Sequence, residues 1–111
     1  MPARFFRAAE ERLIEIWDYT LEKWGEQQAD AYVRGLVGAI HSLASNRQRW
    51  RRVPDRNLAG VWFVRHEHHY IFFREISGGS VGVITVLHES MDLPARIKEV
   101  CSSPERNDAG A

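Results

Sequence analysis

The fold class is decided by two stretches near the end of the chain, His69-Tyr70-Ile71-Phe72-Phe73-Arg74 and Val83-Ile84-Thr85-Val86-Leu87-His88-Glu89-Ser90-Met91-Asp92. Both stretches are rich in β-branched and aromatic residues, which favour strands. Between them, Ser77-Gly78-Gly79-Ser80 supplies the permissive glycines of a hairpin turn. The second stretch is apolar at nearly every position before His88, so we expect both faces of this strand to be covered.

Helical periodicity precedes these strands. Over residues 8–24 apolar side chains recur every three or four positions, and Trp17 and Trp24 fall on this core-facing stripe. Gly25 suits the left-handed conformation at a helix end. A second apolar stripe predicts a helix over residues 26–44. Because the joint is so short, the two helices should fold back on each other as an antiparallel hairpin.

The other predicted elements are short. Strands are predicted at residues 3–6 (an edge strand), 61–65, 69–76 and 81–88, with a turn at 66–68 and an arginine-rich loop at 46–60. Asp92 can cap a short helix that reaches about Val100, and the polar tail from Cys101 is predicted to be disordered. The predicted fold class is α+β: a short N-terminal strand, an antiparallel two-helix hairpin packed on a small antiparallel sheet, and a short C-terminal helix. Residues 1–100 form one domain and residues 101–111 a tail.

Composition places the chain among ordinary soluble globular proteins. It has 111 residues, 44% hydrophobic and 27% charged, which is enough for one domain with a real core. No apolar run is long enough for a membrane span, and the N-terminus lacks the pattern of a signal peptide. Cys101 is the single cysteine, so no internal disulfide is possible and a cytoplasmic location is expected.

Charge is distributed unevenly although the net charge is zero. Residues 47–74 hold seven basic and two acidic side chains, a balance of +5. The basic residues are Arg47, Arg49, Arg51, Arg52, Arg56, Arg65 and Arg74. Arginine binds carboxylates or phosphates through two parallel hydrogen bonds, and a local positive field steers acidic partners. A solvated loop without a partner is the alternative interpretation, and on the strands Arg65 and Arg74 could instead pair with neighbouring carboxylates.

Two tryptophans accompany these arginines. Trp50 lies inside the predicted loop and Trp62 on a predicted strand. An exposed tryptophan flanked by arginine is typical of a protein-binding hot spot. The same composition suits single-stranded nucleic acid, where arginine takes the backbone and an aromatic ring stacks on a base. Both alternatives predict binding.

The histidines suggest two further hypotheses. His66, His68 and His69 could hold a metal, but no second ligand pair stands at a recognisable spacing, so hydrogen-bonded turn histidines are favoured and neither metal nor cofactor is expected. His88 could act as a general base near neutral pH. The favoured alternative is that His88 forms hydrogen bonds that position the last loop.

These motifs, taken together, resemble the ParE toxins of bacterial type II toxin–antitoxin modules, within the RelE/ParE superfamily. The matching segments are Ala8-Ala9-Glu10, Leu13-Ile14-Glu15-Ile16-Trp17-Asp18-Tyr19-Thr20, Trp24-Gly25 with Gln28-Ala29, then Tyr32, Leu36, Ile40 and Leu43-Ala44, Tyr70-Ile71-Phe72-Phe73-Arg74, and Val86-Leu87-His88 with Met91-Asp92. They occur in family order over about residues 4–97. The chain departs from the family in two places. Arg7-Ala8 replaces the serine and proline that usually open the first helix, and Val61-Trp62-Phe63-Val64 follows Gly60 where the family commonly has an aromatic residue and then arginines.

The resemblance implies the fold predicted above and a function. ParE toxins are understood to stall DNA gyrase with its DNA cleaved, without being enzymes themselves, and a cognate antitoxin such as ParD neutralises them. Acidic antitoxin side chains would match the arginines of residues 47–56. Candidates for antitoxin or target contacts are Arg47, Arg49, Trp50, Arg51, Arg52, Arg56, Trp62, Arg65, Arg74, His88 and Met91.

Two alternatives to a gyrase toxin stay open. The first is a RelE-like ribosome-dependent mRNA endonuclease, for which Arg65 and His88 are the candidate catalytic residues. Against it, Tyr70 stands where RelE-like enzymes tend to carry an arginine, and Glu89 would oppose charge at a phosphate. The second is a non-toxic member of the family that is kept only as a binding partner.

Overall fold

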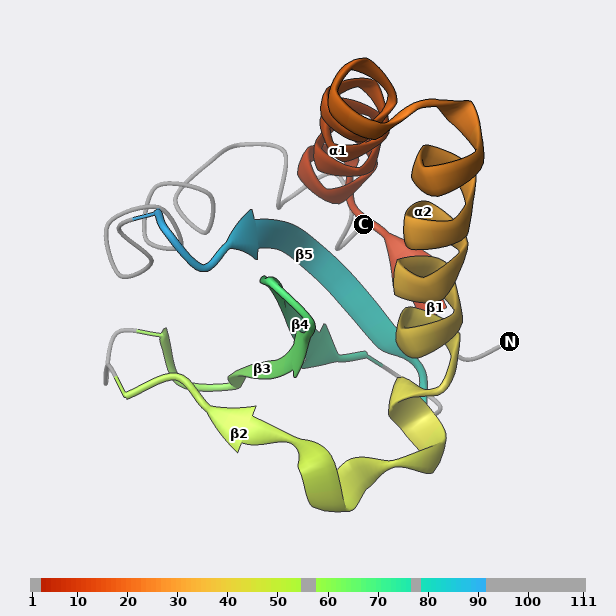
Figure 1. Cartoon of the computed structure of the whole chain (residues 1–111). Coiled ribbons are helices and arrows are strands. Elements are labelled where there is room, and N and C mark those ends of the chain that lie inside the picture. The colour runs from red at the N-terminus through yellow and green to blue at the C-terminus, as the bar shows by residue number, and fades with distance from the viewer. Residues whose placement is uncertain (1–2, 55–57, 77–78, 92–111) are drawn as a thin grey trace.

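A layer of two helices packs on one face of a five-stranded sheet (Figure 1). The computed structural model describes residues 3–54, 58–76 and 79–91. The helices are α1 (Arg7–Trp24) and α2 (Glu26–His41), followed by the 3₁₀ turns η1 (Leu43–Ser45) and η2 (Arg47–Arg49). The strands are β1 (Ala3–Phe5), β2 (Arg51–Arg52), β3 (Val61–His66), β4 (His69–Glu75) and β5 (Val81–His88). The predicted α+β class with its helical hairpin is confirmed.

The sheet is mixed rather than antiparallel. Its strand order is β1-β5-β4-β3-β2, and β2 to β5 pair antiparallel. The edge strand β1 instead runs parallel to β5, with Phe5 opposite Val83. Parallel neighbours need a long connection, and here the helical hairpin and the whole meander separate the two strands in the sequence. The expectation of an antiparallel sheet was therefore wrong for β1 alone.

The helical hairpin forms as the sequence predicts at Gly25. This residue has φ +94°, and its N–H donates to the carbonyl of Leu21 over 2.9 Å. At the start of α1, Phe6 occupies the N-cap position without a side-chain cap. The predicted strand 3–6 therefore ends one residue early, at Phe5. The buried ring of Phe6 packs in the core on the far face of the sheet.

The predicted second helix is three residues too long. α2 ends at His41, and the chain then tightens into η1. The hydroxyl of Ser42 donates to the carbonyl of Ala39 over 2.9 Å, which takes up a backbone acceptor at the helix end. Serine competes in this way with helical hydrogen bonding, so the α-helix stops before residue 44.

The predicted loop at residues 46–60 contains structure that the sequence analysis missed. Trp50 Nε1 donates to the carbonyl of Leu43 over 2.9 Å, and its ring packs edge-on against Phe73 with centroids 4.9 Å apart. These contacts hold the segment to the sheet, so η2 forms and β2 adds to the edge of β3. Smaller differences occur elsewhere: β3 reaches His66, β4 stops at Glu75, and the turn is Glu67–His68, with Glu67 at φ +53°.

Two apolar cores cover the two faces of the sheet. The helix-facing core includes Leu36, Ile40, Ile71, Phe73 and Val83, and the far-face core includes Phe6, Leu58, Phe72, Ile84 and Leu87. Every residue of β5 from Val81 to Leu87 is buried, as its apolar sequence predicts. Trp17 is half-buried, but Trp24 was wrongly predicted to be in the core. It is 71% exposed because it ends α1 beside a groove.

Several predictions fall outside the described residues. These are the helix at residues 92–100, the tail at 101–111, Arg56, and the first two residues of the turn at 77–80. Among the described helices, none has the length and apolar character needed to cross a membrane.

Candidate functional site

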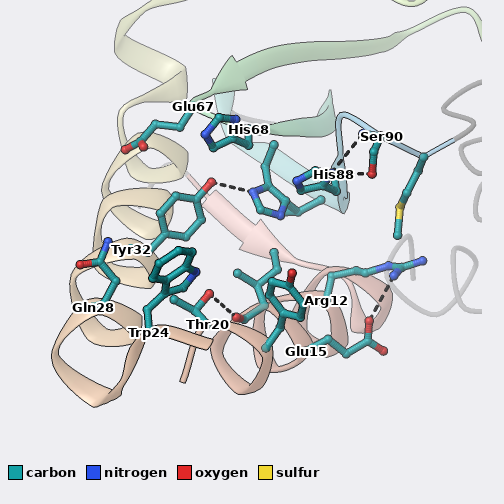
Figure 2. Close-up of a pocket in the computed structure, with 15 residues that line it drawn as sticks. Arg12, Glu15, Thr20, Trp24, Gln28, Tyr32, Glu67, His68, His88 and Ser90 are labelled. Carbon is teal, nitrogen blue, oxygen red and sulfur yellow. Dashed lines mark hydrogen bonds and ion pairs between the residues drawn. The ribbon is translucent and has the colours of Figure 1, made fainter. Parts of the chain in front are cut away.

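One groove lies between the helical layer and the ends of β4 and β5 (Figure 2). It encloses about 740 Å³, and we call it the aromatic groove. The residues used to define it are Tyr19, Trp24, Tyr32, His69, His88 and Met91. Figure 2 shows Trp24 and Tyr32 on the helical wall and His88 and Ser90 on the opposite wall. Trp24 and Tyr19 are 71% and 60% exposed, so the groove presents large apolar side chains to solvent.

A hydrogen bond between Tyr32 and His69 joins the two walls. The Tyr32 hydroxyl lies 2.6 Å from Nδ1 of His69. Burial, with His88 and the other nearby histidines, lowers the pKa of His69 to about 4, so its ring is neutral near pH 7. Burial also raises the pKa of Tyr32, so its hydroxyl keeps the proton. Both groups are therefore neutral near pH 7, and a neutral hydrogen bond joins the two walls.

His88 makes local contacts with the loop that follows it. Its Nδ1 accepts from the backbone N–H of Ser90 over 3.1 Å and lies 2.8 Å from the Ser90 hydroxyl. Its ring stands edge-on to His69, with centroids 5.1 Å apart. Because one nitrogen binds both the amide and the hydroxyl of Ser90, the contact shapes the loop, as the positioning hypothesis for His88 expects. No group of three or more potential ligands among the described residues is placed to hold a metal ion.

A second groove lies at the β2 edge of the sheet and encloses about 630 Å³. We call it the arginine groove and define it by Arg49, Arg51, Phe63, Arg65 and Tyr70. The register places Arg51 opposite Phe63 and Arg65 opposite Tyr70. Phe63 and Tyr70 pack with the far-face core, so these pairs lie on the face away from the helices.

The arginines of this region differ in what they contact. Arg47 pairs with Glu75 and stacks over Trp50, 4.5 Å from the ring centroid. Arg52 stacks over Trp62 at 5.4 Å. Within the described part of the chain, Arg49 and Arg51 form no ion pair, and both are exposed. These two guanidinium groups are therefore free to bind an external anion.

The sequence was also compared with known families and proteins. Residues 3–93 match the family described as the ParE toxin of type II toxin–antitoxin systems, parDE. The chain belongs to the ParE toxin family. Toxin ParE1 of Mycobacterium tuberculosis is 38% identical over 86 residues, which is 78% of this chain and 87% of the relative. Toxin ParE1 of Caulobacter vibrioides is 36% identical over 97 residues, 86% of this chain and 97% of the relative.

Solved structures share the fold of this ParE-family chain. A chain of the chromosomal ParDE system of P. aeruginosa aligns with a TM-score of 0.65 at 20% identity, covering 79% of this chain and 95% of the other. A chain of the RelBE2 toxin–antitoxin complex of Mycobacterium tuberculosis aligns with a TM-score of 0.53 at 20% identity, covering 78% and 95%. At this identity the likeness concerns the fold alone.

The predicted site residues lie at different places in the ParE fold. His88 and Met91 line the aromatic groove, whereas Arg49, Trp50, Arg51 and Arg65 line the arginine groove. Trp50 and Trp62 are half-buried and pack on each other, centroids 5.6 Å apart, instead of standing exposed. Arg74 is half-buried, and its Nε has no hydrogen-bond partner among the described residues.

Arg65 and His88 do not come together in this ParE-family chain. His88 is opposite His69, on the face that carries the helices, whereas Arg65 is opposite Tyr70 on the far face. Glu89 binds Arg65 and accepts a hydrogen bond from His68 Nδ1 at 2.9 Å. The His68 hydrogen bond, helped by Arg65, holds the pKa of Glu89 below its usual value. The carboxylate therefore stays ionised and neutralises Arg65.

Sequence reasoning missed Tyr19, Trp24 and Tyr32 as groove residues because their helical spacing is the spacing of core residues. One signal could have revealed Trp24. It directly precedes the helix-ending Gly25, so it lies at the end of the hairpin rather than in the middle of a helix.

Proposed function

We propose that this ParE-family toxin inhibits DNA gyrase as a protein-binding inhibitor, and that a ParD-like antitoxin neutralises it by occupying the aromatic groove. The observation that carries the proposal is the family match across residues 3–93, which spans both helices and all five strands. A protein-binding toxin needs accessible contact surface rather than converging catalytic groups. The two grooves supply such surface.

The aromatic groove has the composition of a protein-binding hot spot. Exposed Trp24 and Tyr19 offer large, rigid rings, and tryptophan and tyrosine dominate the energetics of protein interfaces. Met91 adds a flexible apolar side chain to the lining. Within the described residues, Nε2 of His69 makes no hydrogen bond, so it is available to a polar group of the partner. An antitoxin segment with an apolar side chain next to such a polar group fits these features.

The alternative of a ribonuclease is less well supported. General acid–base cleavage requires the participating groups to converge on one reacting bond. Arg65 and His88 lie on opposite faces of the sheet, and Glu89 is paired with Arg65. A phosphate approaching Arg65 would therefore meet the carboxylate of Glu89 and not the imidazole of His88. This arrangement favours inhibition by binding over RNA cleavage.

The test uses purified gyrase and supercoiled plasmid. Added toxin should raise the fraction of linear plasmid released by detergent and protease, and equimolar antitoxin should return it to the background level. In cells, expression should arrest growth with filamentation and induction of the DNA-damage response. Cleavage of messenger RNA on ribosomes, abolished by His88→Ala, would refute the gyrase target. A chain that binds its antitoxin but harms neither gyrase nor cells would identify a non-toxic binding partner and also refute it.

A further inference from the structure

The arginine groove faces away from the helices and has no part in the antitoxin site proposed above. From its side chains we infer that the groove binds single-stranded nucleic acid without sequence preference, its arginines on the phosphates and its aromatic rings against a base. This inference rests on the proposed function in one respect: the strand bound in the cell is an unpaired segment of the DNA that gyrase has cleaved.

The charge of the groove is available to a ligand. Arg49 and Arg51 are exposed and form no ion pair within the described residues. Arg65 is paired with Glu89, so the free positive charge of the groove is that of Arg49 and Arg51. From Arg47 to Arg65 the sequence holds one acidic residue, Asp55, which lies outside the described residues. A phosphate group entering the groove thus meets an excess of cations on the described part of its wall.

Arginines and rings alternate across this face of the sheet. Arg51 is opposite Phe63, and two residues further along β3 Arg65 is opposite Tyr70. Residues two apart on a strand are about 7 Å apart on the same face. The rings of Phe63 and Tyr70 are 5.8 Å apart at 71°, and both are half-buried rather than covered. Each ring therefore has a guanidinium beside it, as a platform for stacked bases requires.

The rings distinguish this ligand from an acidic peptide. A row of carboxylates needs only the cations and would leave the partly exposed rings of Phe63 and Tyr70 without a contact. A polynucleotide uses both, because arginine binds phosphate through two parallel hydrogen bonds and any base can stack on a ring. Stacking of unpaired bases on sheet aromatics also favours a single strand over a duplex.

The test measures binding of the full chain to a fluorescent oligothymidylate by anisotropy, with gyrase and antitoxin absent. Affinity should fall with salt, and phosphate contacts by Arg49 and Arg51 predict a slope of about −1.4 in log K against log salt. The double variant Arg49→Glu/Arg51→Glu should weaken binding about tenfold or more, because both of these contacts become repulsive. Tyr70→Leu keeps an apolar side chain but removes the ring, and it should weaken binding about fivefold or more.

Arg4→Glu is the matched control, because Arg4 is exposed on β1 at the opposite edge of the sheet. It should bind the oligonucleotide like the unaltered chain. Equal loss in Arg4→Glu and the groove variant would overturn the inference, as would unchanged binding in both the groove variant and Tyr70→Leu. If poly-glutamate displaces the oligonucleotide at equal charge and Tyr70→Leu has no effect, the groove recognises an acidic polypeptide and the inference fails.

The two proposals can fail separately. Accumulation of cleaved plasmid by gyrase without any oligonucleotide binding would overturn the nucleic-acid site alone. Oligonucleotide binding that depends on Arg49 and Arg51, in a chain that leaves gyrase unaffected, would support the groove while refuting the gyrase target.

Discussion

The hydroxyl of Tyr32 on α2 is hydrogen-bonded to Nδ1 of His69 at the start of β4, across 2.6 Å. The two residues are 37 positions apart in the sequence, and their contact ties the helical hairpin to the sheet at the aromatic groove. Because both groups are neutral near pH 7, the contact joins the two layers without burying a charge.

Tyr32→Phe should lower the free energy of unfolding by about 1 kcal/mol, the usual net worth of one hydrogen bond. Burial of the ring is kept, so the loss reports the hydroxyl alone. Urea denaturation measures the change. Tyr19→Phe is the control, because the Tyr19 side chain is 60% exposed and its hydroxyl makes no hydrogen bond within the described residues. An equal loss in both variants would contradict the role of the Tyr32–His69 contact.

Stability should fall as pH decreases from 6.5 towards 4. The pKa of His69 is lowered from 6.5 to about 4 in the folded chain, so over this interval the unfolded chain binds more protons. Protonation then favours unfolding, and above pH 6.5 this contribution is constant. Glu89 stabilises the folded chain above its ordinary pKa of 4.5, and this contribution is lost as the pH falls through that value and below, because its pKa is lowered in the folded chain.

The variant His69→Asn isolates this contribution. Its amide oxygen can accept from Tyr32 but does not titrate. Unfolding free energies measured between pH 7.5 and pH 4.5 should therefore decline less steeply in the variant. If the unfolding free energies of the two proteins declined equally with pH, His69 would not be the source of the pH dependence.

Gly38→Ala should raise the free energy of unfolding, and Gly35→Ala should raise it by less. Alanine is favoured over glycine in a helix interior by about 1 kcal/mol. A Cβ at Gly38 meets nothing within 4 Å, but one at Gly35 would lie 3.3 Å from Nε2 of His66. The side chain of His66 must then shift, which offsets the gain. Thermal denaturation of the two variants tests the order, and a larger gain for Gly35→Ala would reverse it.

Trp24→Ala should weaken antitoxin binding by about 30-fold or more, as truncation of a tryptophan hot spot does. Titration calorimetry with the cognate antitoxin measures this change. Ile14→Ala is the control, because Ile14 is also exposed on α1, at 61%, but does not line the aromatic groove. Comparable losses in the two variants would place the antitoxin elsewhere on the helix.

The sequence by itself determined the local elements and the family. The apolar run of β5 requires burial on both faces, and Gly25 ends one helix and begins the next because it accepts φ +94°. Both depend on neighbours within a few residues, so the pattern predicts them. The family followed from motifs in order along the chain, and the match over residues 3–93 confirmed it.

Only the tertiary structure decided which side chains meet. Strand register placed Arg65 and His88 on opposite faces, since a shift of one residue reverses the face of every side chain. The contact of Trp50 with Phe73 turned a predicted loop into the edge of the sheet. Such contacts join residues that are distant in the sequence, and local periodicity carries no information about them. The two grooves are therefore created by tertiary packing, although every residue that lines them can be read in the sequence.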